Sequence, residues 1–277
     1  MYSGRTYTPS GFSVLCVHSE IFERPHETRL IRHPRYPYGC THFLHPSPLF
    51  RAEVSIKIPG VPFTLSVLQR QTFKDRGDDT GFACWRASTV LASYLVVHRN
   101  TFAMNISAIE LGCGVGAIVS SVAAWLGFEV DATDGSEQVL IDAQNSIDVA
   151  AQASGYTVKC IFKFEWNKEQ ADHLVKSRGG KKYQLILGSE IVYSLRSQSA
   201  SLAHANFSQL VATLDALLAD DGQILLAWNP RSQLESIFYD ILFSYNLLSS
   251  PLDLNMLNLH HAQTDGIKLI RITRRFT

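Results

Sequence analysis

The sequence lacks an excess of charge and long apolar runs. Its 277 residues contain 25 Lys and Arg and 25 Asp and Glu, so the formal net charge is zero. A neutral chain has no overall field that would attract nucleic acid or an anionic membrane surface. No apolar run approaches the ~20 residues that a membrane-spanning helix needs. We therefore expect neither a membrane nor a nucleic acid as partner.

Cysteine is scarce and follows no pattern. The sequence has five cysteines, an odd number, and they are widely spaced: Cys16, Cys40, Cys84, Cys113 and Cys160. Scattered cysteines of this kind favour free thiols in a reducing compartment. We expect the protein in the cytoplasm or the nucleus.

The first fifty residues have no sustained periodicity. The segment HPRYPYGCTHFLHPSPLF is rich in proline, histidine and aromatic residues, which is typical of a loop or a loosely attached arm. Its histidines and cysteines match no zinc-ligand spacing, so no metal site is expected. The short apolar patch near the start does not predict a signal peptide.

A regular alternation of apolar and polar residues begins at Glu53. Residues 53–73 alternate apolar and polar side chains on both sides of a Pro-Gly pair, which predicts a β-hairpin. The segment FACWRASTVLASYLVVH then has apolar residues at helical spacing. We assign residues 1–79 to an N-terminal arm and hairpin extension, and residues 80–277 to the main domain.

From Asn105 onward, predicted strands and helices alternate. The strands are expected at 106–111, 129–133, 157–164, 184–188 and 223–228, and the helices at 115–126, 137–154, 207–218 and 233–246. This alternation predicts an α/β three-layer sandwich with a mostly parallel sheet. Near the C-terminus, two strand-like runs flank QTDG and predict a closing hairpin that adds an antiparallel strand.

Three glycines, Gly112, Gly114 and Gly116, stand where the strand 106–111 meets the following helix. Glycines there let the backbone approach a ligand closely, and the helix N-terminus favours negative charge. Read as G-x-G-x-x-A, the run is the dinucleotide fingerprint of an NAD-dependent dehydrogenase. Asp134, at the end of the next strand, is placed to bind ribose hydroxyls. Every nucleoside cofactor has such a ribose, so Asp134 does not indicate which cofactor binds.

Glu110 favours S-adenosylmethionine over a dinucleotide as the cofactor. Read from Glu110, the run becomes E-x-G-x-G-x-G, which resembles the first motif of S-adenosylmethionine-dependent methyltransferases. An acid at this point repels a pyrophosphate, whereas it can pair with the cationic amino-acid end of S-adenosylmethionine or order the loop. A third interpretation is a buried acid that caps nearby backbone N–H groups.

Further motifs follow in a fixed order. They are TG-x-x-x-W (Thr80, Gly81, Trp85), TD (Thr133, Asp134), an acid-Trp pair (Glu165, Trp166) and E-x-x-Y (Glu190, Tyr193). From Thr80 to the C-terminus this order resembles the seven-β-strand methyltransferases of family 16, chiefly protein-lysine methyltransferases. The resemblance implies a Rossmann-like methyltransferase fold with a seven-stranded sheet, and S-adenosylmethionine as cofactor.

The resemblance also implies roles for individual residues. Trp85 and Ser189 would lie beside the cofactor, Glu165 would accept the adenine amino group, and Trp166 would pack against the adenine ring. The N-terminal arm and hairpin would lie over the cleft and help to choose the protein substrate.

Glu190 and Tyr193 occupy the catalytic motif, in which Asp is usual where Glu190 stands. By resemblance, Glu190 would orient or help to deprotonate the target nitrogen, and Tyr193 would wall the channel. The implied reaction is methyl transfer to a lysine side chain of a protein partner. Transfer to histidine stays open, as do two alternatives from other classes, an NAD-dependent oxidoreductase and a methyltransferase-like binding protein without activity.

Overall fold

The computed structural model describes residues 51–70, 80–194, 198–257, 259 and 264–275. The predicted N-terminal arm, with its histidines and with Cys16 and Cys40, lies outside the described residues. The same holds for the end of the predicted hairpin beyond residue 70 and for the proposed domain boundary at residue 79.

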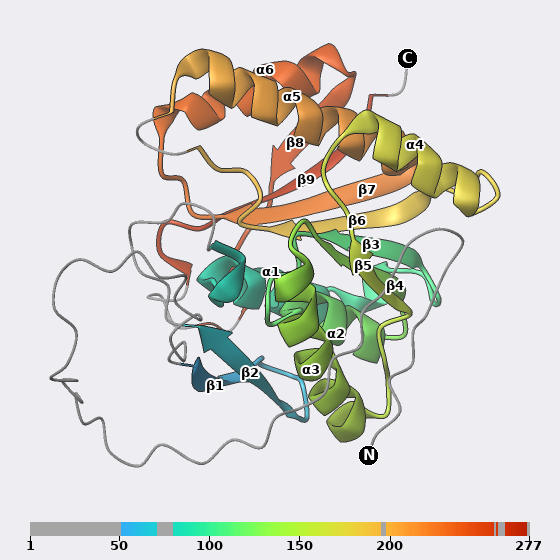
Figure 1. The fold of residues 1–277 in the computed structure, drawn as a ribbon, viewed down its shortest axis with the longest axis vertical. Helices are drawn as coiled ribbons and strands as arrows, with labels where there is room; N and C mark the ends of the chain where they lie inside the picture. The colour runs from blue at the N-terminus through green and yellow to red at the C-terminus, as the bar shows by residue number, and fades with distance from the viewer. Residues whose placement is uncertain (1–50, 71–79, 195–197, 258, 260–263, 276–277) are drawn as a thin grey trace, which may run out of the picture.

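A seven-stranded sheet in the order β5-β4-β3-β6-β7-β9-β8 forms the centre of the molecule (Figure 1). Its strands are β3 (Ser107–Leu111), β4 (Glu129–Asp134), β5 (Cys160–Lys163), β6 (Tyr183–Ser189), β7 (Leu218–Trp228), β8 (Leu247–Pro251) and β9 (Lys268–Arg274). The pairs from β5 to β7 are parallel, and β9 runs antiparallel to both β7 and β8. The predicted mostly parallel sheet with an antiparallel C-terminal strand is confirmed.

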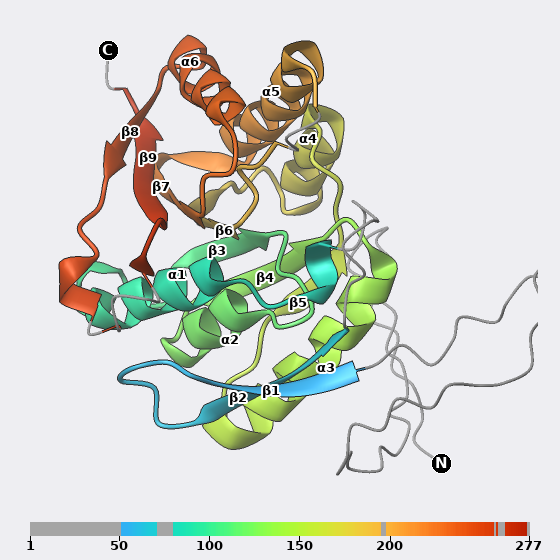
Figure 2. The same ribbon diagram turned by 90° about the vertical axis from the view of Figure 1, so that its left-hand side faces the viewer.

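Helices cover both faces of this sheet. Figures 1 and 2 show α1 (Arg86–Val97), α2 (Ile118–Trp125) and α3 (Glu137–Ser154) on one face, and α4 (Lys168–Ser177), α5 (Ala200–Leu217) and α6 (Ser236–Ser244) on the other. Strand β6 is a nearly continuous apolar run, and most of its residues are buried. Such a run is typical of a parallel strand that helices cover on both faces. Within the described residues, none of the helices has the length and apolarity to span a membrane.

The β-hairpin forms an additional layer outside α2 and α3 (Figure 2). Its strands β1 (Arg51–Lys57) and β2 (Thr64–Arg70) pair antiparallel around a turn in which Gly60 has φ +83°. Leu65 and Val67 are buried against Val96 and Val139, so the hairpin shares a core with the helices. The predicted hairpin is confirmed, and the boundary at residue 79 stays a prediction.

The chain after β5 differs from the sequence-based prediction at two places. The predicted antiparallel C-terminal strand is β9, which pairs with β8, whereas Asn255–Leu257 in the first predicted run forms a short 3-10 turn. Residues 258 and 260–263, which include the start of QTDG, lie outside the described residues. The apolar alternation of the first predicted run serves to bury Leu257 in the core. The helix α4 was not predicted, because Ala171 and Leu174 are its only buried residues and leave a weak apolar stripe.

Helix ends follow local capping chemistry. Helix α3 begins where the Ser136 side chain accepts a hydrogen bond from the Val139 N–H, and it ends at Gly155, whose φ is +77°. Helix α5 begins at Ala200, well before the predicted start at residue 207, because Ser199 caps it by accepting from the Leu202 N–H.

Candidate active site

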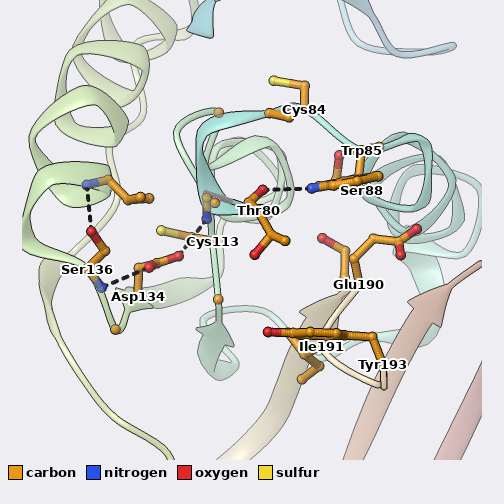
Figure 3. A pocket seen from close by; sticks show the side chains of 18 of the residues that line it. Thr80, Cys84, Trp85, Ser88, Cys113, Asp134, Ser136, Glu190, Ile191 and Tyr193 are labelled. Atoms are coloured by element: carbon orange, nitrogen blue, oxygen red, sulfur yellow. Dashed lines mark hydrogen bonds between the residues drawn. The ribbon is translucent and has the colours of Figure 1, made fainter. Parts of the chain in front are cut away.

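A cavity of about 310 Å³ lies at the carboxyl ends of the parallel strands (Figure 3). The strand order reverses between β3 and β6, which is where ligands bind in open α/β sheets. Figure 3 places Asp134 and Ser136 on one side of the cavity, and Trp85, Glu190 and Tyr193 on the other. Most residues predicted for the site line it: Trp85, Gly112, Gly114, Gly116, Asp134, Glu165, Trp166, Ser189, Glu190 and Tyr193.

The loop after β3 brings bare backbone to the cavity. Gly112 and Gly114 have φ values of +69° and +59°, which L side chains rarely adopt. A Cβ added at Gly112 would lie 2.9 Å from Cγ2 of Ile191, and one at Gly114 would lie 3.3 Å from the Gly81 carbonyl oxygen. Val115 N–H donates to that same carbonyl over 2.9 Å, which ties the segment before α1 to the loop. These positions therefore require glycine.

Asp134 closes one end of the cavity at the tip of β4. Its carboxylate accepts hydrogen bonds from the Gly114 N–H (3.1 Å) and the Ser136 N–H (3.0 Å). Burial raises the pKa of Asp134, and the hydrogen bonds from the Ser136 and Gly114 backbone act against this rise. A carboxylate has about four acceptor positions, so two bonds leave capacity for ligand hydroxyls.

Glu110 does not line the cavity. Its side chain points from β3 to the first turn of α2 and is fully buried, and its Oε2 accepts from both the N–H (2.8 Å) and the hydroxyl of Ser120. Burial raises the pKa of Glu110 to about 7. The capping of backbone N–H groups agrees with this geometry, as does the ordering of the loop, and the pairing of Glu110 with a cationic ligand end stays a prediction.

The segment after β5 lines the cavity with an aromatic ring and an acid. Trp166 is half-buried, and its Cζ2 lies 3.5 Å from the Cβ position of Gly112. Glu165 is exposed and forms an ion pair with Lys163 at 3.2 Å. The Glu165 N–H donates to the Gln170 side chain over 3.0 Å, which holds this segment against the start of α4.

Glu190 follows β6 in a left-handed conformation, with φ +58°. This conformation is uncommon outside glycine and turns the chain sharply at the cavity. The side chain is only 7% exposed, and its Oε1 accepts from the Asn229 N–H over 3.2 Å. Burial raises the pKa of Glu190, and the nearby Arg231 guanidinium opposes this rise.

Arg231 was missed by sequence reasoning. Its Nη2 donates to Oε2 of Glu190 over 2.6 Å, and its guanidinium carbon lies 4.4 Å from the centre of the Trp85 ring. The Trp85 indole N–H is held by the Thr80 carbonyl at 2.8 Å. The available signal was the place of Arg231 just after β7, the strand beside β6, but no motif marks it.

Ser189 and Tyr193 complete the wall next to Glu190, and both are half-buried. Tyr193 also borders a second hollow of about 340 Å³ that reaches toward α5. The two hollows share Glu165, Trp166, Ile191 and Tyr193. Tyr193 thus stands between the cavity and the surface formed by α5.

Comparison with known families gives one family match. A model described as "Lysine methyltransferase" matches residues 68–244. The Mus musculus protein N-lysine methyltransferase METTL21A is 30% identical over 159 residues, which are 57% of this chain and 65% of that protein. The Mus musculus protein-lysine methyltransferase METTL21E is 29% identical over 183 residues, 65% of this chain and 70% of that protein. The chain thus covers less than two thirds of the length of METTL21A.

Solved structures share the fold. The T. thermophilus 16S rRNA N2 G1207 methyltransferase (RsmC), in complex with AdoMet and guanosine, aligns with a TM-score of 0.53 at 16% identity. That alignment covers 83% of this chain and 52% of RsmC. The protein SMU.776 complexed with SAH aligns with a TM-score of 0.52 at 13% identity, over 82% of this chain and 57% of that one.

Proposed function

The chain belongs to the lysine methyltransferase family, and on this premise we propose that it transfers a methyl group from S-adenosylmethionine to a lysine side chain of a protein. The observation that carries the proposal is the cavity at the switch point of the sheet, where the glycine loop and Asp134 meet Glu190. With this family membership, the oxidoreductase alternative loses its support.

The residues at one end of the cavity fit the proposed cofactor. The positive φ values of Gly112 and Gly114 leave bare backbone that a side chain would obstruct, and Asp134 keeps acceptor capacity for ribose hydroxyls. Glu165 and Trp166 line the cavity and would receive the adenine, and Ser189 would lie beside the cofactor. When bound, the cofactor supplies an electrophilic methyl group on a positively charged sulfur.

The other end of the cavity suits the nucleophile. A lysine side chain has a pKa of about 10.4 and arrives as an ammonium ion, but only the neutral amine can attack the methyl group. Glu190 is placed to hold the target nitrogen and to accept its proton, and Tyr193 limits the direction from which the side chain enters. The cytoplasm or the nucleus is the proposed location.

Cofactor binding is the first test. We expect calorimetry to detect S-adenosylhomocysteine binding to the wild type, and we expect Asp134→Ala to weaken it at least about tenfold through loss of the ribose acceptor. Asp172→Ala is the control, because Asp172 is exposed on α4 and pairs with Lys168. NADH binding without S-adenosylhomocysteine binding would contradict the proposal.

Methyl transfer is the second test. The protein is incubated with labelled S-adenosylmethionine and a cell extract, and the labelled protein and residue are identified by mass spectrometry. We expect a methylated lysine, and Glu190→Gln should abolish labelling while it leaves cofactor affinity nearly unchanged. A labelled histidine would favour the histidine alternative, and undiminished labelling by Glu190→Gln would remove Glu190 from the mechanism.

A further inference from the structure

Residues 80–85, just before α1, contact both the cavity and the core of the β-hairpin. Most of them line the cavity: Thr80, Gly81, Ala83, Cys84 and Trp85. Phe82 and Cys84 also pack against the apolar cluster that contains Leu65 and Val67 of β2. This segment is therefore a wall that the cavity and the hairpin core share.

Gln69 of β2 holds this segment from the hairpin side. Its side-chain oxygen accepts a hydrogen bond from the Cys84 N–H over 3.2 Å. Leu65, Val67 and Gln69 alternate along β2, so all three lie on the face of the hairpin that packs against the helices. A partly buried backbone N–H needs an acceptor, and Gln69 provides it for Cys84.

On its other side the segment contacts the glycine loop and Asp134. The Gly81 carbonyl oxygen accepts from the Val115 N–H over 2.9 Å. A Cβ added at Gly81 would lie 2.9 Å from Cγ2 of Val139, which belongs to the same cluster as Leu65, and 3.8 Å from a carboxylate oxygen of Asp134. Gly81 thus lies between the hairpin core and the acid proposed to bind the ribose.

We propose that Gln69 is a positioning residue for cofactor binding, and that docking of the hairpin and binding of the cofactor stabilise each other through residues 80–85. Gln69 holds the Cys84 backbone and thereby keeps the segment in the shape that receives S-adenosylmethionine. This inference rests on the cofactor part of the proposed function and leaves the roles of the cavity residues unchanged. It gives the hairpin a role at the cofactor end of the cavity.

The physical basis of this coupling is preorganisation. A ligand that must order a segment as it binds loses affinity, because the segment loses conformational entropy at that step. The hydrogen bond from Cys84 to Gln69 and the packing of Phe82 order the segment before the cofactor arrives. Coupling between two sites is reciprocal. The bound cofactor should therefore stabilise the docked hairpin by the same factor by which the hairpin raises cofactor affinity.

Calorimetry with S-adenosylhomocysteine on the purified full chain is the first measurement. Gln69→Ala removes the acceptor of the Cys84 N–H, and we expect the affinity to fall about fivefold, the size expected for one hydrogen bond. Gln69→Glu keeps an acceptor oxygen at this place and should restore most of the affinity. Equal affinities in the wild type and Gln69→Ala would overturn the proposal, as would an equal loss in Gln69→Ala and Gln69→Glu.

Gln184→Ala is the matched control. The Gln184 side-chain oxygen also accepts from a backbone N–H, that of Ser107, over 3.3 Å. This bond lies at the amino ends of β3 and β6, whereas the cavity lies at the carboxyl ends. We expect Gln184→Ala to bind S-adenosylhomocysteine as the wild type does. A loss as large as that in Gln69→Ala would indicate a general loss of stability and would contradict the positioning role. Thermal unfolding verifies that each variant is folded.

Amide hydrogen exchange tests the reciprocal effect on the hairpin. With saturating S-adenosylhomocysteine, the β2 amides that pair with β1 should exchange more slowly in the wild type, by about the same fivefold factor. The slowing should be smaller in Gln69→Ala, because the hairpin then opens without disturbing residues 80–85. Unchanged exchange of β2 in the wild type would overturn the coupling, as would an equal slowing in both proteins.

The same samples separate this inference from the proposed function. Failure of the wild type to bind S-adenosylhomocysteine would contradict the methyltransferase proposal and, with it, the role of Gln69. Normal binding by the wild type with unchanged affinity in Gln69→Ala would contradict the positioning role alone.

Discussion

Glu110 and Glu190 are two buried glutamates at the carboxyl ends of the neighbouring strands β3 and β6, yet they face different surroundings. Glu110 binds the backbone and hydroxyl of Ser120 and holds the glycine loop to α2. Glu190 faces the cavity and pairs with Arg231. Burial raises the pKa of both carboxyl groups, so their difference lies in the partner and not in the type of residue.

The backbone explains this difference. Glu110 lies within β3, where strand alternation directs its side chain toward the covering helix. Glu190 lies one residue beyond β6 and has φ +58°, which breaks the alternation and turns the side chain into the cavity. A strained residue next to a ligand site is a common mark of function, whereas a residue in regular geometry at the same depth serves the scaffold.

The largest effect is expected on the glycine-loop side, from Gly112→Arg. The new side chain would enter the cavity from a position where even a Cβ lies 2.9 Å from Ile191, so we expect S-adenosylhomocysteine affinity to fall at least about a hundredfold. Calorimetry measures the loss. Gly155→Ala is the control, because Gly155 also has a positive φ, +77°, but has open space around its Cβ position. Unchanged affinity in Gly112→Arg would place the cofactor elsewhere.

Glu110→Gln is expected to change how stability depends on pH. The native pKa of Glu110, about 7, exceeds the ordinary value of 4.5, so between these values the folded state binds more protons than the unfolded state. The free energy of unfolding therefore falls as pH rises through this window, by up to about 3 kcal/mol. The Gln side chain still accepts from Ser120 and cannot ionise, which removes the contribution of this residue to the fall.

Urea unfolding at about pH 5 and about pH 8 measures this difference. Glu110 also interacts electrostatically with Asp134 and Cys113, and the variant retains both of these residues. Glu165→Gln is the control, because Glu165 is exposed. An identical pH dependence in the wild type and Glu110→Gln would show that the buried carboxyl does not titrate in this range.

The smallest effect tests the strain at Glu190. Glu190→Gly and Glu190→Ala both remove the carboxylate and differ only in Cβ, which is unfavourable at φ +58°. We expect Glu190→Gly to be the more stable by about 1 kcal/mol, or about 2–4 °C in Tm. At Glu137, in the first turn of α3, the same comparison should favour Ala. Equal stabilities at Glu190 would remove the argument from strain.

Much of the fold follows from local sequence. Alternating apolar strands and helices predicted the parallel sheet, and the ends of α3 are marked by Ser136 and Gly155. The antiparallel strand β9 was predicted, but its pairing with β8 was not, because the apolar alternation at Asn255–Leu257 buries Leu257 in the core in place of forming a strand. Helix α4 escaped prediction because it is largely solvated and its apolar stripe is weak.

The sequence by itself determined where the backbone turns and which residue types end each strand, because glycines, capping residues and apolar periodicity act over a few neighbouring positions. It therefore placed Gly112, Gly114 and Asp134 at one edge of the sheet. Only the tertiary structure decided that Glu110 turns inward to Ser120, and that Arg231 reaches Glu190 and Trp85. These contacts join residues from separate strand ends, and their partners depend on strand order, side-chain direction and burial.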